Sequence, residues 1–128
     1  MRWRVLVEVT GSDGCMSAAT LGPGERSGPT HTAATLGLTL TEGKTMVAAL
    51  QQIIVRTQAV EHCASRRRCG HCGAQLPVKD QRPRRLLTPY GVVAVRAPRL
   101  GPCRCGVGCR RSITPVAEIM LDRCTPDY

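Results

Sequence analysis

The sequence predicts an α+β chain with N-terminal β-strands, one long amphipathic helix and a small zinc-ribbon-like β module. Three observations predict this class: apolar and polar residues alternate over 2–9, an apolar stripe recurs over 39–65, and two cysteine pairs flank a candidate hairpin. The 128 residues suffice for one domain or two small pieces. With two tyrosines, one tryptophan and no phenylalanine, the core must be aliphatic, so a metal ion would be a useful support.

The N-terminal region, residues 1–35, is expected to form a strand pair and a loop. Within RWRVLVEV (2–9), Trp3 and the valines at 5, 7 and 9 share one face, which is typical of a strand with one buried side. Residues 11–14 favour a turn, and CMSAATL (15–21) is expected to return as the partner strand. Residues 22–34 are rich in Gly, Pro, Ser and Thr and predict a loop. We expect Trp3 to anchor the core or an edge.

Residues 36–65 are predicted to hold the long helix, beginning near Thr39. Thr39 and Glu42 match a TxxE capping box, in which each residue satisfies an amide of the other. A helix over 39–65 would be about 40 Å long, more than the small core can cover. Part of its stripe is therefore expected to contact a second copy or a following domain, and the alternative is that the helix packs on the N-terminal strands alone. The apolar stripe consists of Met46, Val47, Leu50, Ile53, Ile54, Thr57 and Val60.

Residues 66–111 are predicted to form a zinc-ribbon-like module. A CxxCG element (Cys69, Cys72) and a CxCG element (Cys103, Cys105) could together supply the four thiolates of a structural zinc site. A glycine follows the second cysteine of each pair, where a positive φ lets the backbone curl toward the sulfurs. The 30 intervening residues exceed the usual spacing. Cys109 could replace Cys103 or Cys105 as a ligand, and that alternative stays open.

The remaining histidines and cysteines are weaker ligand candidates. His71 lies inside the first cysteine turn, and we expect it to be solvated because two thiols already occupy that turn. His62 and Cys63 end the preceding helix and are not expected to bind the metal. Cys15 and Cys124 are far from any partner in sequence. The N-terminus has no export signal, which predicts a reducing cytoplasmic location where paired cysteines favour metal over disulfides.

A hairpin is predicted between the two cysteine elements, in RRLLTPYGVVAVRA (84–97). Two short apolar runs flank Pro89 to Gly91, a typical turn sequence. Residues 112–128 begin a new apolar pattern, and Ile119, Met120 and Leu121 have nothing downstream to pack on. We therefore expect residues 112–128 to be the truncated start of a further region.

Positive charge is concentrated on the cysteine module. Of the 18 basic residues that give the net charge of +9, twelve lie between residues 63 and 111, against a single acid, Asp80. Nearly all are arginines, whose guanidinium groups pair with phosphate in a bidentate manner. Nucleic acid is therefore the expected partner, and no apolar run is long enough to span a membrane. The predicted DNA contacts are Arg66, Arg67, Arg68, Arg82, Arg84, Arg85 and Arg99.

Several segments, taken in order, resemble the N-terminal region of bacterial insertion-sequence transposases of the Kra-type family. They are LGLTLTEGKTMVAALQQIIVRTQ, RRRCGHCG, VKDQRPRRLLTPYGVVAVRAPR, PCRCG and TPVAEIMLDRCTP. In that family a helix and a zinc-ribbon-like module precede an RNase H-like catalytic domain that cuts and joins DNA. The resemblance implies that Cys69, Cys72, Cys103 and Cys105 take the zinc positions. No catalytic residue is carried over, because the chain ends before that domain.

The expected function is therefore DNA binding at insertion-sequence ends during DNA transposition and recombination, with a nucleoid-associated location and no enzymatic activity of this chain alone. One alternative is a zinc ribbon that mediates protein contacts in transcription or translation machinery. Another is a regulatory fragment that pairs with full-length transposase through helix 39–65. A decayed reading frame without a role is a further alternative.

Overall fold

The computed structural model describes residues 1–28 and 31–127, and its fold is α+β. The chain divides into two compact units, Met1–Ile54 and Val55–Tyr128, and each contains one two-stranded antiparallel sheet. The division falls within the long helix α1 (Leu40–Ser65), so each unit includes part of this helix. The predicted fold class is thus confirmed at the level of four strands in two small sheets and one long helix.

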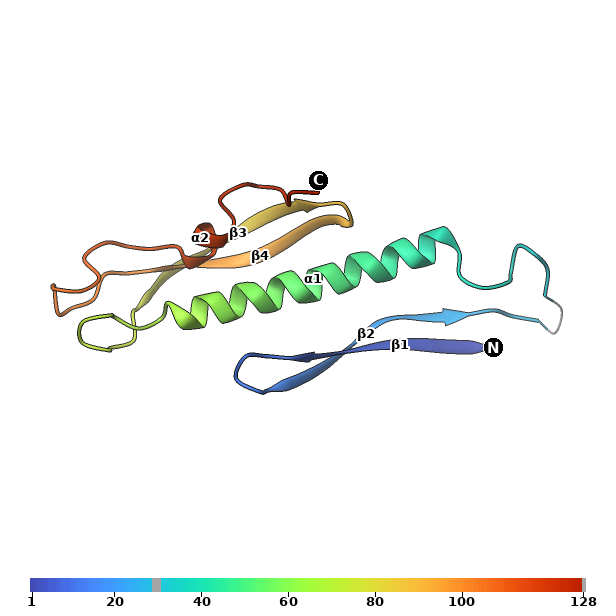
Figure 1. The fold of residues 1–128 in the computed structure, drawn as a ribbon, viewed down its shortest axis with the longest axis horizontal. Helices are drawn as coiled ribbons and strands as arrows, with labels where there is room; N and C mark the ends of the chain where they lie inside the picture. The colour runs from blue at the N-terminus through green and yellow to red at the C-terminus, as the bar shows by residue number, and fades with distance from the viewer. Residues whose placement is uncertain (29–30, 128) are drawn as a thin grey trace. The chain divides into compact units, whose positions relative to one another are not determined.

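The first unit begins with a β-hairpin of β1 (Arg2–Thr10) and β2 (Met16–Glu25) (Figure 1). Alternate residues of β1 are half-buried, as the sequence pattern predicts. The prediction that a loop begins at residue 22 is wrong, because β2 continues to Glu25 beyond a register shift opposite Val5 and Leu6. Pro23 is compatible with this strand because each strand of a two-stranded sheet has a free edge, where no amide donor is needed.

Trp3 anchors this hairpin, as expected from the sequence. Its indole lies over Gly24 of the facing strand, where a side chain would overlap the ring. The guanidinium group of Arg26 lies 4.9 Å from the ring centroid, which is a cation–π distance. The indole is therefore held between neighbouring groups of its own unit.

The predicted capping box at the start of α1 is confirmed. The amide of Glu42 donates to Thr39 Oγ1 (3.1 Å), and the amide of Thr39 donates to Glu42 Oε2 (2.8 Å). Arg26 donates to both oxygens of the Glu42 carboxylate at 2.7 Å. These hydrogen bonds, the one from Arg26 first, lower the pKa of Glu42 to about 2.

The face of α1 that packs in the second unit differs from the predicted stripe. Ala59 is buried, with Val55 and Cys63 one turn to either side, whereas Val60 is 69% exposed. Val60, a member of the predicted apolar stripe, therefore lies outside the packed face. Val47 and Ile54 are also exposed, and self-association through this helix stays a prediction. No helix in the described ranges is long and apolar enough to cross a bilayer.

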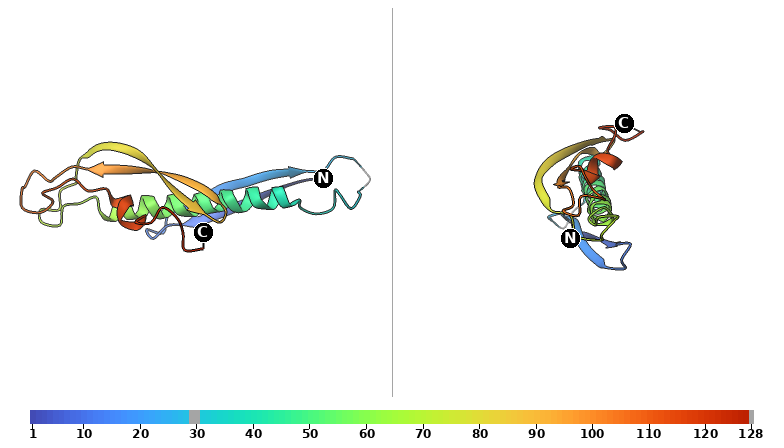
Figure 2. Two further views of the ribbon diagram at one scale, coloured as in Figure 1. Left: turned by 90° about the horizontal axis from the view of Figure 1, so that it is seen from above. Right: turned by 90° about the vertical axis from the view of Figure 1, so that its left-hand side faces the viewer.

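The sheet of the second unit is a twisted hairpin of β3 (Val78–Thr88) and β4 (Gly91–Leu100) (Figures 1 and 2). The predicted turn at residues 89–90 is confirmed, and Thr88 Oγ1 closes it by donating to the Gly91 carbonyl (2.7 Å) and accepting from the Tyr90 amide (3.2 Å). Both strands are longer than predicted. The hairpin therefore runs from the turn to the cysteine loops.

The core of the second unit is small and aliphatic, and it includes the C-terminal tail. Val93, Val95 and Ala97 of β4 pack with Ala59 and with two residues of the tail, Val116 and Met120. Val116 lies in the short helix α2 (Pro115–Ile119), which contacts β4. Met120 is only 5% exposed, because it packs on residues that precede it in the sequence. Ile119 and Leu121 are exposed.

Candidate metal centre and basic surface

Two loops at one end of the β3–β4 hairpin bring the predicted cysteine elements together (Figures 1 and 2). The first loop follows α1 and is closed by hydrogen bonds from Cys69 N–H to the Ala74 carbonyl and from Leu76 N–H to the Arg67 carbonyl, both 2.8 Å. The second loop follows β4, and in it Cys103 N–H donates to the Cys109 carbonyl (2.7 Å). Each loop is thus a tight turn that presents two thiols.

The four predicted ligands, Cys69, Cys72, Cys103 and Cys105, form one cluster. Their sulfur atoms all lie within 4.8 Å of one another. The separation is 3.7 Å from Cys69 to Cys105 and 3.3 Å from Cys72 to Cys103. A tetrahedron with Zn–S bonds of about 2.3 Å has sulfur–sulfur edges of about 3.8 Å. The spacing therefore suits a tetrahedral ion such as zinc, and it exceeds the roughly 2.05 Å of a disulfide.

Two glycines shape the loops as the sequence predicts. Gly73 has φ +72° and Gly106 has φ +71°, a region that favours glycine. The amide of Gly73 donates to the Cys69 carbonyl (2.9 Å), and the amide of Gly106 donates to the Cys103 carbonyl (3.2 Å). In both cysteine elements, despite their different lengths, a glycine with positive φ thus donates its amide to the carbonyl of the first cysteine.

Backbone amides point at the thiols and favour their charged form. Amides of Cys72, Cys109 and His71 lower the pKa of Cys69 to about 5. Amides of Gly108 and Val107 lower the pKa of Cys105. These hydrogen bonds favour the thiolate forms of Cys69 and Cys105, and the thiolate is the form of cysteine that binds metal ions.

Cys103 shows how strongly the neighbouring thiols affect one another. The amide of Cys105 acts to lower the pKa of Cys103, but the neighbouring thiols of Cys72 and Cys105 outweigh it and raise the pKa to about 12. Several thiolates this close cannot all be charged without a counter-ion. A divalent metal would remove that conflict by binding all four sulfurs.

An apolar layer supports the cluster from one side. Cys69 is 3% exposed and packs with Leu76 and Leu100, which are each 1% exposed. Leu100 and Ile113 exchange backbone hydrogen bonds of 2.8 and 2.9 Å. The loops therefore rest on a small core of their own. Gly108 leaves no room for a side chain, because a Cβ there would overlap Cys69 Sγ.

The other cysteines and histidines lie outside the sulfur cluster. Cys109 contributes its backbone, accepting from Cys103 and donating to Cys69, whereas its thiol is not part of the set. His71 is exposed, as expected. Cys63 packs against the aliphatic core, where burial raises the pKa of its thiol. Cys15 and Cys124 are exposed free thiols.

Some of the arginines predicted to contact DNA have polar partners within the protein, and others do not. Arg66 pairs with Glu118 (3.2 Å) and Arg99 with Asp80 (2.6 Å). Arg67 is half-buried and donates to the Leu76 carbonyl. In contrast, Arg82 and Arg85 are exposed and have no polar partner among the described residues.

Two further members of the predicted set have backbone partners. Arg68 is exposed and donates to the Gly73 carbonyl (3.1 Å). Arg84 is half-buried and donates to the Met120 carbonyl (3.4 Å). Both keep further N–H donors, because a guanidinium group carries five.

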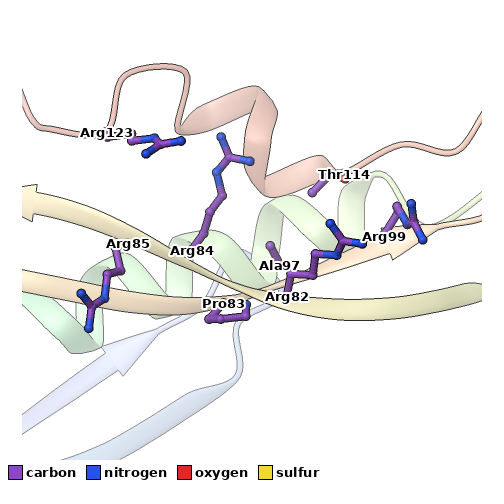
Figure 3. Close-up of a pocket in the computed structure, with 8 residues that line it drawn as sticks. All are labelled: Arg82, Pro83, Arg84, Arg85, Ala97, Arg99, Thr114 and Arg123. Carbon is purple, nitrogen blue, oxygen red and sulfur yellow. The ribbon is translucent and has the colours of Figure 1, made fainter.

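A groove of about 470 Å³ collects part of this charge on the second unit (Figure 3). Sequence reasoning missed Arg123, which joins the groove because the tail runs beside β3. Arg123 is distant from the other groove arginines in the sequence, so no local sequence pattern predicts that it lies beside them. The lining residues are Arg82, Pro83, Arg84, Arg85, Ala97, Arg99, Thr114 and Arg123.

In comparisons with known proteins, no protein-family model, no curated protein and no solved structure matches this chain.

Proposed function

We propose that the second unit is a zinc-ribbon-like module that binds DNA, and that it acts at insertion-sequence ends during transposition. The observation that carries the proposal is the set of four clustered sulfurs, Cys69, Cys72, Cys103 and Cys105, within a strongly basic segment. A structural zinc ion would hold the two loops together. The arginines around them would then face a polyanion from a fixed scaffold.

The zinc part of the proposal rests on ligand chemistry. Four thiolates in a tetrahedral arrangement are the usual ligand set of a closed structural zinc site, with no open position for substrate. In small zinc peptides such binding supplies about 10–16 kcal/mol, which is comparable to the roughly 5–15 kcal/mol net stability of a whole domain. The small aliphatic core of the second unit makes that contribution important.

The nucleic-acid part rests on charge and residue type. Twelve basic residues against one acid between residues 63 and 111 produce a positive field that the remaining residues do not share. Arginine forks bind phosphate oxygens in pairs. The link to transposition comes from the sequence resemblance alone, and insertion-sequence ends are the DNA that it suggests.

Zinc content and salt-dependent DNA binding test the proposal together. The purified chain should hold one equivalent of zinc, and chelation should unfold the second unit, as followed by circular dichroism. Affinity for a duplex should fall with salt by about 0.9 logarithmic units per decade of salt for each phosphate neutralised. The element-end duplex should bind more tightly than a scrambled duplex of the same length. Zinc below half an equivalent would overturn the metal assignment, and salt-insensitive or absent binding would overturn the DNA assignment.

A further inference from the structure

The arginine groove of Figure 3 is the strongest unassigned feature of the second unit. Arg82 and Arg84 come from β3, Arg99 comes from β4, and Arg123 comes from the C-terminal tail. Figure 3 shows the guanidinium groups of Arg84 and Arg123 extending toward one another, whereas that of Arg85 points away. Within the described part of the chain, no acidic residue lines the groove.

Regular structure places these side chains. Arg82 and Arg84 are two residues apart on β3 and therefore share a face of the strand. The tail is held beside the same strand, since Leu87 N–H donates to the Arg123 carbonyl (2.8 Å) and Thr125 N–H donates to the Leu87 carbonyl (2.9 Å). The position of Arg123 is thus fixed by backbone bonds, and its side chain is available.

The groove has more donors than the protein uses. Arg82 and Arg123 have no polar side-chain partner among residues 1–28 and 31–127. Arg84 donates to one carbonyl at 3.4 Å. Each guanidinium group has five N–H donors and no acceptor. Several like charges gathered around one groove repel one another unless an anion lies between them.

We propose that this groove holds the sugar–phosphate backbone of the bound nucleic acid, with Arg82 and Arg123 each neutralising a phosphate. The inference rests on the proposed DNA binding and deepens it by assigning the contact site. Arg84 would add donors at the floor of the groove. Arg99 would contribute less, because Asp80 already pairs with it.

The test compares two double variants that remove the same charge. R82Q/R123Q removes two groove arginines that have no polar partner among the described residues, and it leaves Arg85, whose guanidinium group points away (Figure 3). R96Q/R111Q is the matched control, since both residues are exposed, lie in the same unit and do not line the groove. The magnitude of the logarithmic salt slope for a short duplex should fall by about 1.8 for R82Q/R123Q, at about 0.9 per phosphate. The slope for the control should fall by less than half as much.

A slope that is smaller by about 1.8 means that the affinity of R82Q/R123Q changes about twelvefold less than that of the unaltered protein between 50 and 200 mM salt. Equal slopes for the two variants would overturn the groove assignment, because the binding would then follow net charge alone. In that outcome the proposed DNA binding would stand. Failure of the unaltered protein to bind the duplex would instead overturn the proposed function itself. Zinc content and circular dichroism must match the unaltered protein in both variants, and Arg→Lys at the same positions provides a rescue if either misfolds.

Discussion

Gly108→Ala should disrupt metal binding without altering any ligand. A Cβ at position 108 would overlap Cys69 Sγ and would lie 2.9 Å from His71 Cβ. Carbon atoms pack at about 3.5–4.0 Å, so the loop would have to move by about 0.6 Å or more. Metal–ligand distances are held to within about 0.2 Å. The added methyl group therefore displaces a sulfur well beyond the tolerance of a tetrahedral site.

The expected effect is at least a tenfold loss of zinc affinity, the lower range seen when the surroundings of metal ligands are altered. Competition with a chromophoric chelator measures the affinity, and the absorption of bound Co²⁺ reports whether the site stays tetrahedral. Gly70→Ala is the matched control, because it lies in the first cysteine loop and nothing is within 4 Å of its added Cβ. Equal affinities for the two variants would refute the reasoning.

Three further predictions follow from individual contacts. Glu42 has its pKa lowered from 4.5 to about 2, so its contribution to stability is complete above pH 4.5 and is lost as the pH falls toward 2. Urea unfolding across that range should show a smaller acid loss for Glu42→Gln, and identical losses would contradict this. Met120→Ala should lower the free energy of unfolding by about 2–5 kcal/mol. Leu121 is 81% exposed, so Leu121→Ala should change that free energy by less than about 0.5 kcal/mol. Similar effects of the two substitutions in thermal melts would mean that the tail does not pack. Cys109→Ala should retain one equivalent of zinc, while Cys105→Ala should lose it, and the reverse result in metal analysis would exchange the two ligand assignments.

Local signals predicted the parts of the fold that depend on neighbouring residues. The start of α1 follows from Thr39 and Glu42, whose reciprocal hydrogen bonds need only a three-residue spacing. The cysteine loops follow from Gly73 and Gly106, because a positive φ after the second cysteine is a local requirement. The turn between β3 and β4 likewise follows from its Pro and Gly residues.

Strand lengths were harder to predict because proline occurs both at the ends of strands and within edge strands. Pro83 and Pro98 suggest the ends of strands, yet both lie within the β3–β4 pairing. A two-stranded sheet gives each strand a free edge, where proline costs no hydrogen bond. The sequence does not reveal how many strands a sheet will have, so the hairpin was predicted too short.

Contacts between distant segments could not be predicted. The packed face of α1 centres on Ala59, and a pattern based on large aliphatic residues favoured Val60 instead. A small residue allows close approach to the sheet, which depends on a partner that local periodicity does not show. The same holds for Arg123, which reaches the groove through the pairing of the tail with β3.

The placement of two sulfurs before the β3–β4 hairpin and two after it has a consequence for turnover in the cell. An ion bound to all four would close the intervening segment into a ring, which lowers the entropy of the unfolded chain. Without the ion that ring would open, and the hairpin would become a substrate for proteases that attack locally unfolded chains. The lifetime of the protein would then follow the supply of zinc.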